Sequence, residues 1–109
     1  MKKKKWGRIV NIGSSSSYTG FKNGSAYCSS KHAVLGLSRT LSNEFKKKNV
    51  RVFCVSPGSS KTKMGKKCKK QNFETFINPK EIAEYIINII KFDKEMIIEE
   101  SRLSRIKMG

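Results

Sequence analysis

Three short apolar runs are spaced along the chain and predict strands. Residues 8–12, RIVNI, form a β-branched run that Gly13 closes. Residues 50–55, VRVFCV, are apolar on both sides apart from Arg51, and the run from Met96 to Ile98 begins a third, short strand. Buried strands of a parallel sheet have this composition.

Two helices are expected between these runs. Ser25 is a candidate cap for the first, whose apolar stripe follows the helical period at Ala33, Val34, Leu37, Leu41 and Phe45. Lysines 46–48 would oppose the negative end of its dipole, and Asn49 would take the left-handed stop.

The second helix has a strong start signal. Asn78 is its expected cap, Pro79 occupies the first helical position and Glu81 the third. Its predicted stripe consists of Ala83, Ile86, Ile87 and Ile90.

The order strand–helix–strand–helix–strand predicts an α/β fold with a parallel sheet and crossover helices. A chain of 109 residues is enough for one small domain. Ligands of such sheets bind beyond the carboxyl ends of the strands. The polar loops 13–25 and 56–77 leave from those ends and are expected to border one crevice.

The stretch AYCSSKHAVLG places a tyrosine and a lysine four residues apart. On a helix, Tyr27 and Lys31 share one face, which is either a surface accident or a phenol tuned by an ammonium group. A free tyrosine has a pKa of about 10, and a nearby cation stabilises its phenolate. Such a phenol suits acid–base chemistry on a carbonyl or alcohol, with a hydroxyl from GSSSS holding the substrate oxygen.

Charge leaves a second class of function open. The formal net charge is +16, with lysines in blocks, and such charge attracts polyanions. The 24 basic residues are nevertheless mostly lysine, and the aromatic residues are not interleaved with the basic blocks as stacking platforms would be. A general lysine bias explains the charge more simply than a nucleic-acid-binding module does.

Other classes find less support. Cys28, Cys54 and Cys68 are widely spaced and form neither a disulfide framework nor a CxxC metal site, and His32 is the only histidine. We therefore expect no metal. No apolar run approaches a membrane span, and the basic start lacks the apolar stretch of a signal peptide, so we expect a cytoplasmic protein without a membrane partner.

Three motifs in order, GRIVNIGS, AYCSSKHAVLGLSRTLSNEF and VRVFCVSPGSSKTKM, strongly resemble the carboxyl-terminal half of the short-chain dehydrogenase/reductase family. The resemblance runs from about Gly7 to Met64 and more weakly to the third strand. It implies a partial Rossmann-like, doubly wound parallel sheet, β-α-β-α-β, that lacks the amino-terminal cofactor-binding half. Residues 1–109 would form a single partial NAD(P)-binding domain.

The resemblance also implies roles for individual residues. Tyr27 would be the catalytic acid–base, Lys31 would favour its phenolate and hold the hydroxyls of the nicotinamide ribose, and Ser14 would orient the substrate. Residues 15–17 look like ordinary loop serines. Besides Tyr27 and Lys31, four further positions would bind the cofactor. Pro57 and Gly58 would shape the turn under the nicotinamide. The backbone of Ser60, which replaces the family's usual aliphatic residue, and Thr62 would complete the set.

The amino end departs from the family pattern. No glycine-rich dinucleotide turn is present, because Gly20 and Gly24 follow the wrong strand and Ala26 stands where a further glycine is needed. The choice between NAD and NADP is therefore undetermined. We expect a truncated or split product with little activity alone, a small-molecule carbonyl or alcohol substrate, and a homo-oligomer in the full-length form. The alternative is a non-catalytic remnant that pairs with a full-length subunit.

Overall fold

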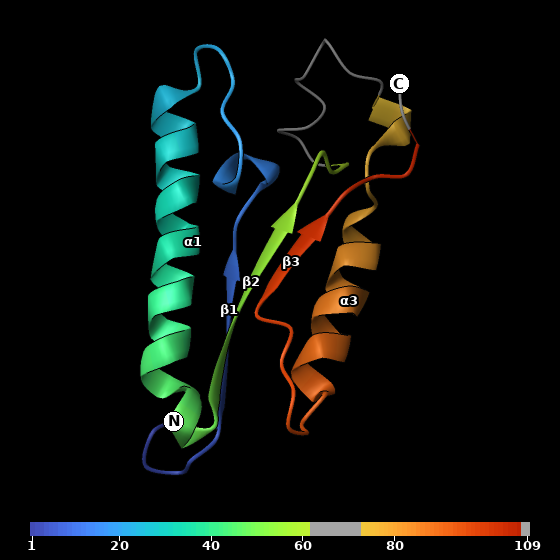
Figure 1. Cartoon of the computed structure of the whole chain (residues 1–109). Helices are drawn as coiled ribbons and strands as arrows, with labels where there is room; N and C mark the ends of the chain where they lie inside the picture. The colour runs from blue at the N-terminus through green and yellow to red at the C-terminus, as the bar shows by residue number, and fades with distance from the viewer. Residues whose placement is uncertain (62–72, 108–109) are drawn as a thin grey trace.

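The computed structural model describes residues 1–61 and 73–107, and within them the expected α/β architecture is confirmed. Three parallel strands form one sheet in the order β1-β2-β3, and the two long helices alternate with them along the chain. Figure 1 shows α1 and α3 on opposite sides of the sheet, with the arrowheads of all three strands pointing to the same end. The loop that leads from β1 into α1 also lies at that end.

The central strand is the most deeply buried element. β2 spans Val50–Pro57, and its residues from Val52 to Ser56 are all buried. It pairs on one side with β1, Gly7–Ile12, and on the other with β3, Glu100–Leu103. A strand covered on both faces must be apolar on both, as the run VRVFCV predicted.

The first helix, α1, spans Ser25–Phe45, and two predictions about it are wrong. Gly24, rather than Ser25, occupies the cap position, and no side chain caps this end. The predicted apolar stripe is not the buried one, since Leu37 is 54% exposed. The buried positions are instead Cys28, Leu35, Ser38 and Ser42. Apart from Leu35, these buried side chains are small or polar, and apolar periodicity does not detect them.

The carboxyl end of α1 follows the sequence more closely. A short 3-10 turn over Lys46–Lys48 follows the helix, and Asn49 adopts the left-handed conformation at φ 54° and ψ 27°. The predicted stop residue is therefore confirmed, and it leads directly into β2.

The second long helix, α3, spans Pro79–Lys91 and has the expected cap. The Asn78 side chain accepts a hydrogen bond from the backbone N–H of Lys80 at 3.0 Å, and Pro79 takes the first helical position. Its packed face is shifted from the predicted one, since Ile87 is 50% exposed. Tyr85, Ile86 and Ile89 form the contact with the sheet, against Phe53 and Val55.

The third strand was expected to begin within Met96–Ile98, and this start is wrong, because β3 begins two residues later, at Glu100. Arg51 explains the shift, because its guanidinium donates hydrogen bonds to the carbonyls of Phe92, Lys94 and Met96. These bonds hold the chain in a turn around the arginine, and Met96 is 62% exposed. Only after this turn does the backbone reach β2 and pair with it.

In the part of the chain that the structure describes, no helix combines the length and apolar character needed to cross a membrane.

Candidate functional site

Ser14 lies two residues beyond the end of β1, at the start of the 3-10 turn η1, Ser15–Ser17. Its hydroxyl accepts a hydrogen bond from the backbone N–H of Ser16 at 3.1 Å. Its own backbone N–H donates to the hydroxyl of Ser17, also at 3.1 Å. This reciprocal capping box fixes both the backbone and the side chain of Ser14. Ser17, which looked like an ordinary loop residue, is 1% exposed and takes part in that box.

Gly13 brings residues 14–17, called the serine turn below, against the carboxyl end of β2. Its backbone N–H donates to the carbonyl of Val55 at 2.9 Å. A Cβ at this position would stand 2.5 Å from the hydroxyl oxygen of Ser56 and 2.8 Å from that of Ser17. Glycine is required here because no larger residue allows the approach. The serine turn and the end of β2 are thereby joined through small, buried groups.

Tyr27 and Lys31 lie in the first two turns of α1, on the same side. The ammonium nitrogen of Lys31 is 5.7 Å from the centroid of the Tyr27 ring. The Tyr27 hydroxyl donates to the hydroxyl oxygen of Ser14 at 3.5 Å. The Tyr27 ring is half-buried, and the ring of Phe21 lies 6.2 Å away between centroids. The fold thus brings together the serine, tyrosine and lysine that the sequence singled out.

His32 lies one residue further along α1. Its Nδ1 is 2.7 Å from the carbonyl oxygen of Cys28, within its own helix. This local contact is the ordinary structural use of a histidine. Among the described residues, no group of three or more histidine, cysteine or acidic side chains is arranged to hold a metal ion.

The segment that follows β2 presents backbone groups beside this end of the sheet. Gly58 donates its N–H to the carbonyl of Leu103 at 2.8 Å. Ser60 forms an isolated parallel bridge with Ile77, and the bridging hydrogen bonds use the N–H of Lys61 and the carbonyl of Ser59. In this pattern the N–H and carbonyl of Ser60 itself point away from Ile77. Thr62 lies outside the described residues.

The cavity at the carboxyl end of β3 is separate from the serine, tyrosine and lysine. It encloses about 540 Å³ between the region of η3, Phe73–Thr75, the first turns of α3 and the segment after β3. Its described lining includes Lys61, Tyr85, Leu103 and Arg105, and none of Ser14, Tyr27 and Lys31. The expectation of a single crevice bordered by both polar loops is thus not met by this cavity.

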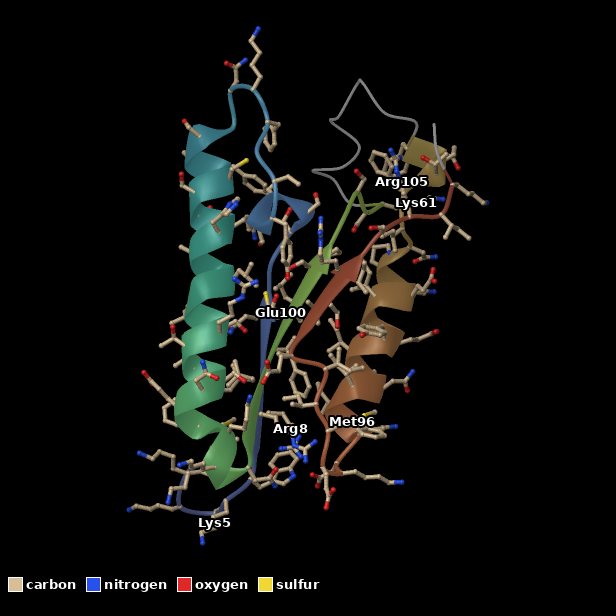
Figure 2. All side chains as sticks on the ribbon, viewed as in Figure 1. Lys5, Arg8, Lys61, Met96, Glu100 and Arg105 are labelled. Atoms are coloured by element: carbon tan, nitrogen blue, oxygen red, sulfur yellow. The ribbon has the colours of Figure 1, made fainter. Side chains whose placement is uncertain are left out.

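A cluster beside the serine turn was missed at the level of sequence. The carboxylate of Glu100, on β3, accepts hydrogen bonds from Tyr18 at 3.0 Å and from Arg39 at 2.7 Å and 3.0 Å. Figure 2 shows Glu100 on the side of the sheet that faces α1. The hydrogen bond from Arg39 lowers the pKa of the Glu100 carboxyl below its usual range. Burial, followed by the hydrogen bond to Glu100, raises the pKa of Tyr18.

No sequence signal pointed to this cluster, because its members are separated by 21 to 82 residues along the chain. The periodicity of a helix or strand relates positions a few residues apart. Only the sheet register, which pairs Glu100 with Cys54, brings this carboxylate to the side of α1.

The parallel sheet, with polar loops at the carboxyl ends of its strands, is of the type that binds dinucleotides. Comparison with known proteins gives the family. The sequence pattern of the family described as short chain dehydrogenase matches residues 1–72. The chain therefore belongs to the short-chain dehydrogenase/reductase family, and its fold is a partial Rossmann-like sheet.

Individual relatives agree with this family. Secoisolariciresinol dehydrogenase of Forsythia intermedia is 43% identical over 76 residues, which cover 66% of this chain and 27% of the relative. The 3-oxoacyl-acyl-carrier-protein reductase FabG of Buchnera aphidicola is 37% identical over 89 residues, which cover 82% of this chain and 33% of the relative.

Solved structures match almost the whole chain. ElxO with NADP bound superimposes with a TM-score of 0.80 at 28% identity, covering 96% of this chain and 47% of that protein. The 4-hydroxyisoleucine dehydrogenase complexed with NADH superimposes with a TM-score of 0.75 at 32% identity, covering 94% of this chain and 46% of that protein. The chain thus spans a third or less of these two curated relatives and less than half of these solved structures.

Proposed function

We propose that this chain carries the proton-transfer part of an NAD(P)-dependent oxidoreductase that interconverts a carbonyl and an alcohol. The observation that carries the proposal is the meeting of Ser14, Tyr27 and Lys31 at one end of the sheet. The Tyr27 hydroxyl lies 3.5 Å from the Ser14 hydroxyl, and the Lys31 ammonium lies 5.7 Å from the Tyr27 ring.

Each of these side chains has a defined task in the proposal. Tyr27 exchanges the proton at its hydroxyl oxygen with the oxygen of a small-molecule substrate. Ser14, fixed by its capping box, donates a hydrogen bond that orients the same oxygen. Lys31, whose ammonium nitrogen lies 5.7 Å from the centroid of the Tyr27 ring, binds the ribose hydroxyls of the cofactor. The cofactor, when bound, supplies or accepts the hydride.

The groups around the site suit the nicotinamide half of NAD or NADP. Pro57 and Gly58 would shape the turn next to the ring, and the backbone N–H and carbonyl of Ser60 match the acceptor and donor of its carboxamide. Thr62 remains a predicted contact. The named neighbours ElxO and 4-hydroxyisoleucine dehydrogenase contain NADP and NADH, which supports this class of cofactor without choosing between the two.

We further propose that residues 1–109 act as one partial domain with little activity alone. The sequence contains no glycine-rich dinucleotide turn, and the chain covers 47% of the NADP-bound relative ElxO. Half a cofactor site loses most of its binding contacts. A cytoplasmic location and a homo-oligomeric full-length form remain predictions.

Titration with half-cofactors tests the proposal directly. Nicotinamide mononucleotide, added to the purified ¹⁵N-labelled chain, should shift the amide resonances of Tyr27, Lys31 and Ser60, whereas adenosine monophosphate should not. Lys31→Met should abolish the shifts, and Lys47→Met, at an exposed lysine beyond the helix, should leave them unchanged. Equal responses to both nucleotides, or none at Tyr27, would refute the assignment.

A non-catalytic remnant that pairs with a full-length subunit is the second candidate. It is favoured by Leu37, which is 54% exposed on α1, and by Ile12, which is 48% exposed at the end of β1. A chain of that kind should co-purify with a full-length relative and should give no shifts with nicotinamide mononucleotide. The half-cofactor titration therefore separates the two candidates.

A further inference from the structure

Glu100 joins the serine turn to the helix that carries the tyrosine. Tyr18 follows η1 directly, four residues after Ser14, and its hydroxyl donates to Oε1 of Glu100 at 3.0 Å. Arg39, on α1, donates from Nε to Oε2 at 2.7 Å and from Nη2 to Oε1 at 3.0 Å. One carboxylate on β3 thus binds both elements whose hydroxyl groups meet at the site.

The geometry of these hydrogen bonds holds the Glu100 carboxylate and the Tyr18 hydroxyl in place. The two parallel bonds from Arg39 fix the carboxylate in the plane of the guanidinium, and an ionised acceptor strengthens each of the three hydrogen bonds. The guanidinium of Arg102 stacks over the Tyr18 ring at 4.4 Å from its centroid. Tyr18 therefore has a fixed hydroxyl and a covered ring, and the turn that precedes it is fixed with it.

We propose that Glu100 is a positioning residue, which holds Ser14 within hydrogen-bonding distance of Tyr27 by fastening Tyr18 to α1 through Arg39. The role deepens the proposed function, because Ser14 and Tyr27 are its substrate-orienting and proton-transfer groups. Without Glu100, the serine turn would remain attached to the sheet through the hydrogen bond from Gly13 to Val55 and through the contact of the Tyr18 ring with Arg102 on β3.

The neighbouring Glu99 provides a matched control. Its carboxylate accepts a hydrogen bond from Ser42 at 3.3 Å and forms an ion pair with Lys46, so both of these contacts are with α1 or the turn that follows it. Glu99 and Glu100 carry the same charge, are adjacent in the chain and both connect the β3 segment with the region of α1. Of the two, Glu100 bonds to Tyr18.

The test observes Tyr27 itself in the full 109-residue chain. The tyrosine ring carbons bonded to oxygen are labelled with ¹³C, and the resonances of Tyr18, Tyr27 and Tyr85 are assigned with Tyr→Phe variants. Ser14→Ala, which removes the hydroxyl partner, defines the direction and size of the change at Tyr27. Glu100→Gln should move the Tyr27 resonance in the same direction by at least half that amount. Glu99→Gln should leave it in place.

Tyr18→Phe separates positioning from loss of charge. It keeps the Arg39–Glu100 ion pair and removes only the bond to the serine turn, so it should shift the Tyr27 resonance as Glu100→Gln does. The double variant Tyr18→Phe/Glu100→Gln should add nothing to either single change, because both interrupt one connection. Circular dichroism of each variant checks that the fold is kept, and Tyr18→Phe decides the question if Glu100→Gln unfolds.

Three results would overturn the proposal. The Tyr27 resonance could stay unmoved in Tyr18→Phe and Glu100→Gln while Ser14→Ala shifts it. Glu99→Gln could shift it as much as Glu100→Gln, which would indicate a general effect of charge. Ser14→Ala could leave it unmoved, so that no contact exists to position. None of these measurements contains a cofactor, so a failed half-cofactor titration would count against the proposed function alone.

Discussion

The two faces of the sheet are built from different kinds of residue. On the side of α3, Phe53, Val55 and Ile89 form an apolar core with the partly buried side chains of Tyr85 and Ile86. On the side of α1, three of the four buried positions of the helix are small or polar, and the sheet presents Cys54, Ser56 and Glu100 there beside the apolar Val50 and Val52.

The difference also appears in what lies between each helix and the sheet. The Cα atoms of α1 approach those of β1 and β2 within 8 Å at several positions, and large side chains pack between α3 and the sheet. Apolar contacts stabilise a fold without regard to direction, and hydrogen bonds between small groups fix distances and angles. The face under α3 supplies stability, and the face under α1 supplies the geometry of the proposed site.

Truncating the apolar core should have the largest effect. Phe53 is 2% exposed, so Phe53→Ala should lower the free energy of unfolding by about 3–5 kcal/mol. Leu37→Ala, at a 54% exposed position of α1, should change it by less than about 0.5 kcal/mol. Urea denaturation of both variants makes the measurement. Similar losses in the two would mean that the faces do not differ as described.

Adding a methyl group at Gly13, beside the serine turn, should have the second-largest effect on stability. In Gly13→Ala the new methyl group collides with the hydroxyls of Ser56 and Ser17, which should cost about 1–3 kcal/mol and displace Ser14. Gly36→Ala is the control, because a Cβ there meets nothing within 4 Å and alanine should gain about 0.5–1 kcal/mol in the helix. Thermal denaturation compares them, and a tolerated Gly13→Ala would disprove the close approach.

Removing one hydrogen bond from the polar layer should cost less. Ser42 is 3% exposed and donates to Glu99 at 3.3 Å, so Ser42→Ala should cost about 0.5–1.5 kcal/mol. Thr40, on the exposed side of α1, bonds to the carbonyl of Gly36 in its own helix, and Thr40→Ala should be nearly neutral. Urea midpoints distinguish the two. A loss from Ser42→Ala as large as that from Phe53→Ala would show that polar contacts dominate stability here.

The smallest expected effect is a pH dependence that arises on the polar face. Folding lowers the pKa of Glu100, so its contribution to stability is complete above the unfolded value and is lost as pH falls through the folded value. Folding raises the pKa of Tyr18, so its contribution is present below about pH 10 and is lost as pH rises through the folded value. Melting temperatures across pH, compared with Glu100→Gln, should show the acid loss reduced in the variant. If the melting temperature of Glu100→Gln falls at low pH as much as that of the unchanged chain, Glu100 is not the source of the acid dependence.

Much of the fold followed from local pattern. The alternation of strands and helices, the buried strand that follows Asn49, the Asn78 cap and the left-handed Asn49 were predicted because each depends on a few neighbouring residues. The third strand was misplaced because Arg51, 43 residues earlier, holds the carbonyl of Lys94 in a turn. The stripe of α1 was misassigned because Ser38 and Ser42 are buried together with Cys28 and Leu35, so the buried face does not follow the apolar residues alone.

By itself the sequence determined the family, the alternation of strands and helices, and the serine, tyrosine and lysine that the proposed chemistry needs. Their motifs are short, so local spacing reveals them. Tertiary structure alone decided that the hydroxyls of Ser14 and Tyr27 meet, and that position 13 has no room for a side chain. It also decided that Glu100 connects the serine turn with α1. These contacts join distant segments, and their distances depend on how closely α1 packs on the sheet.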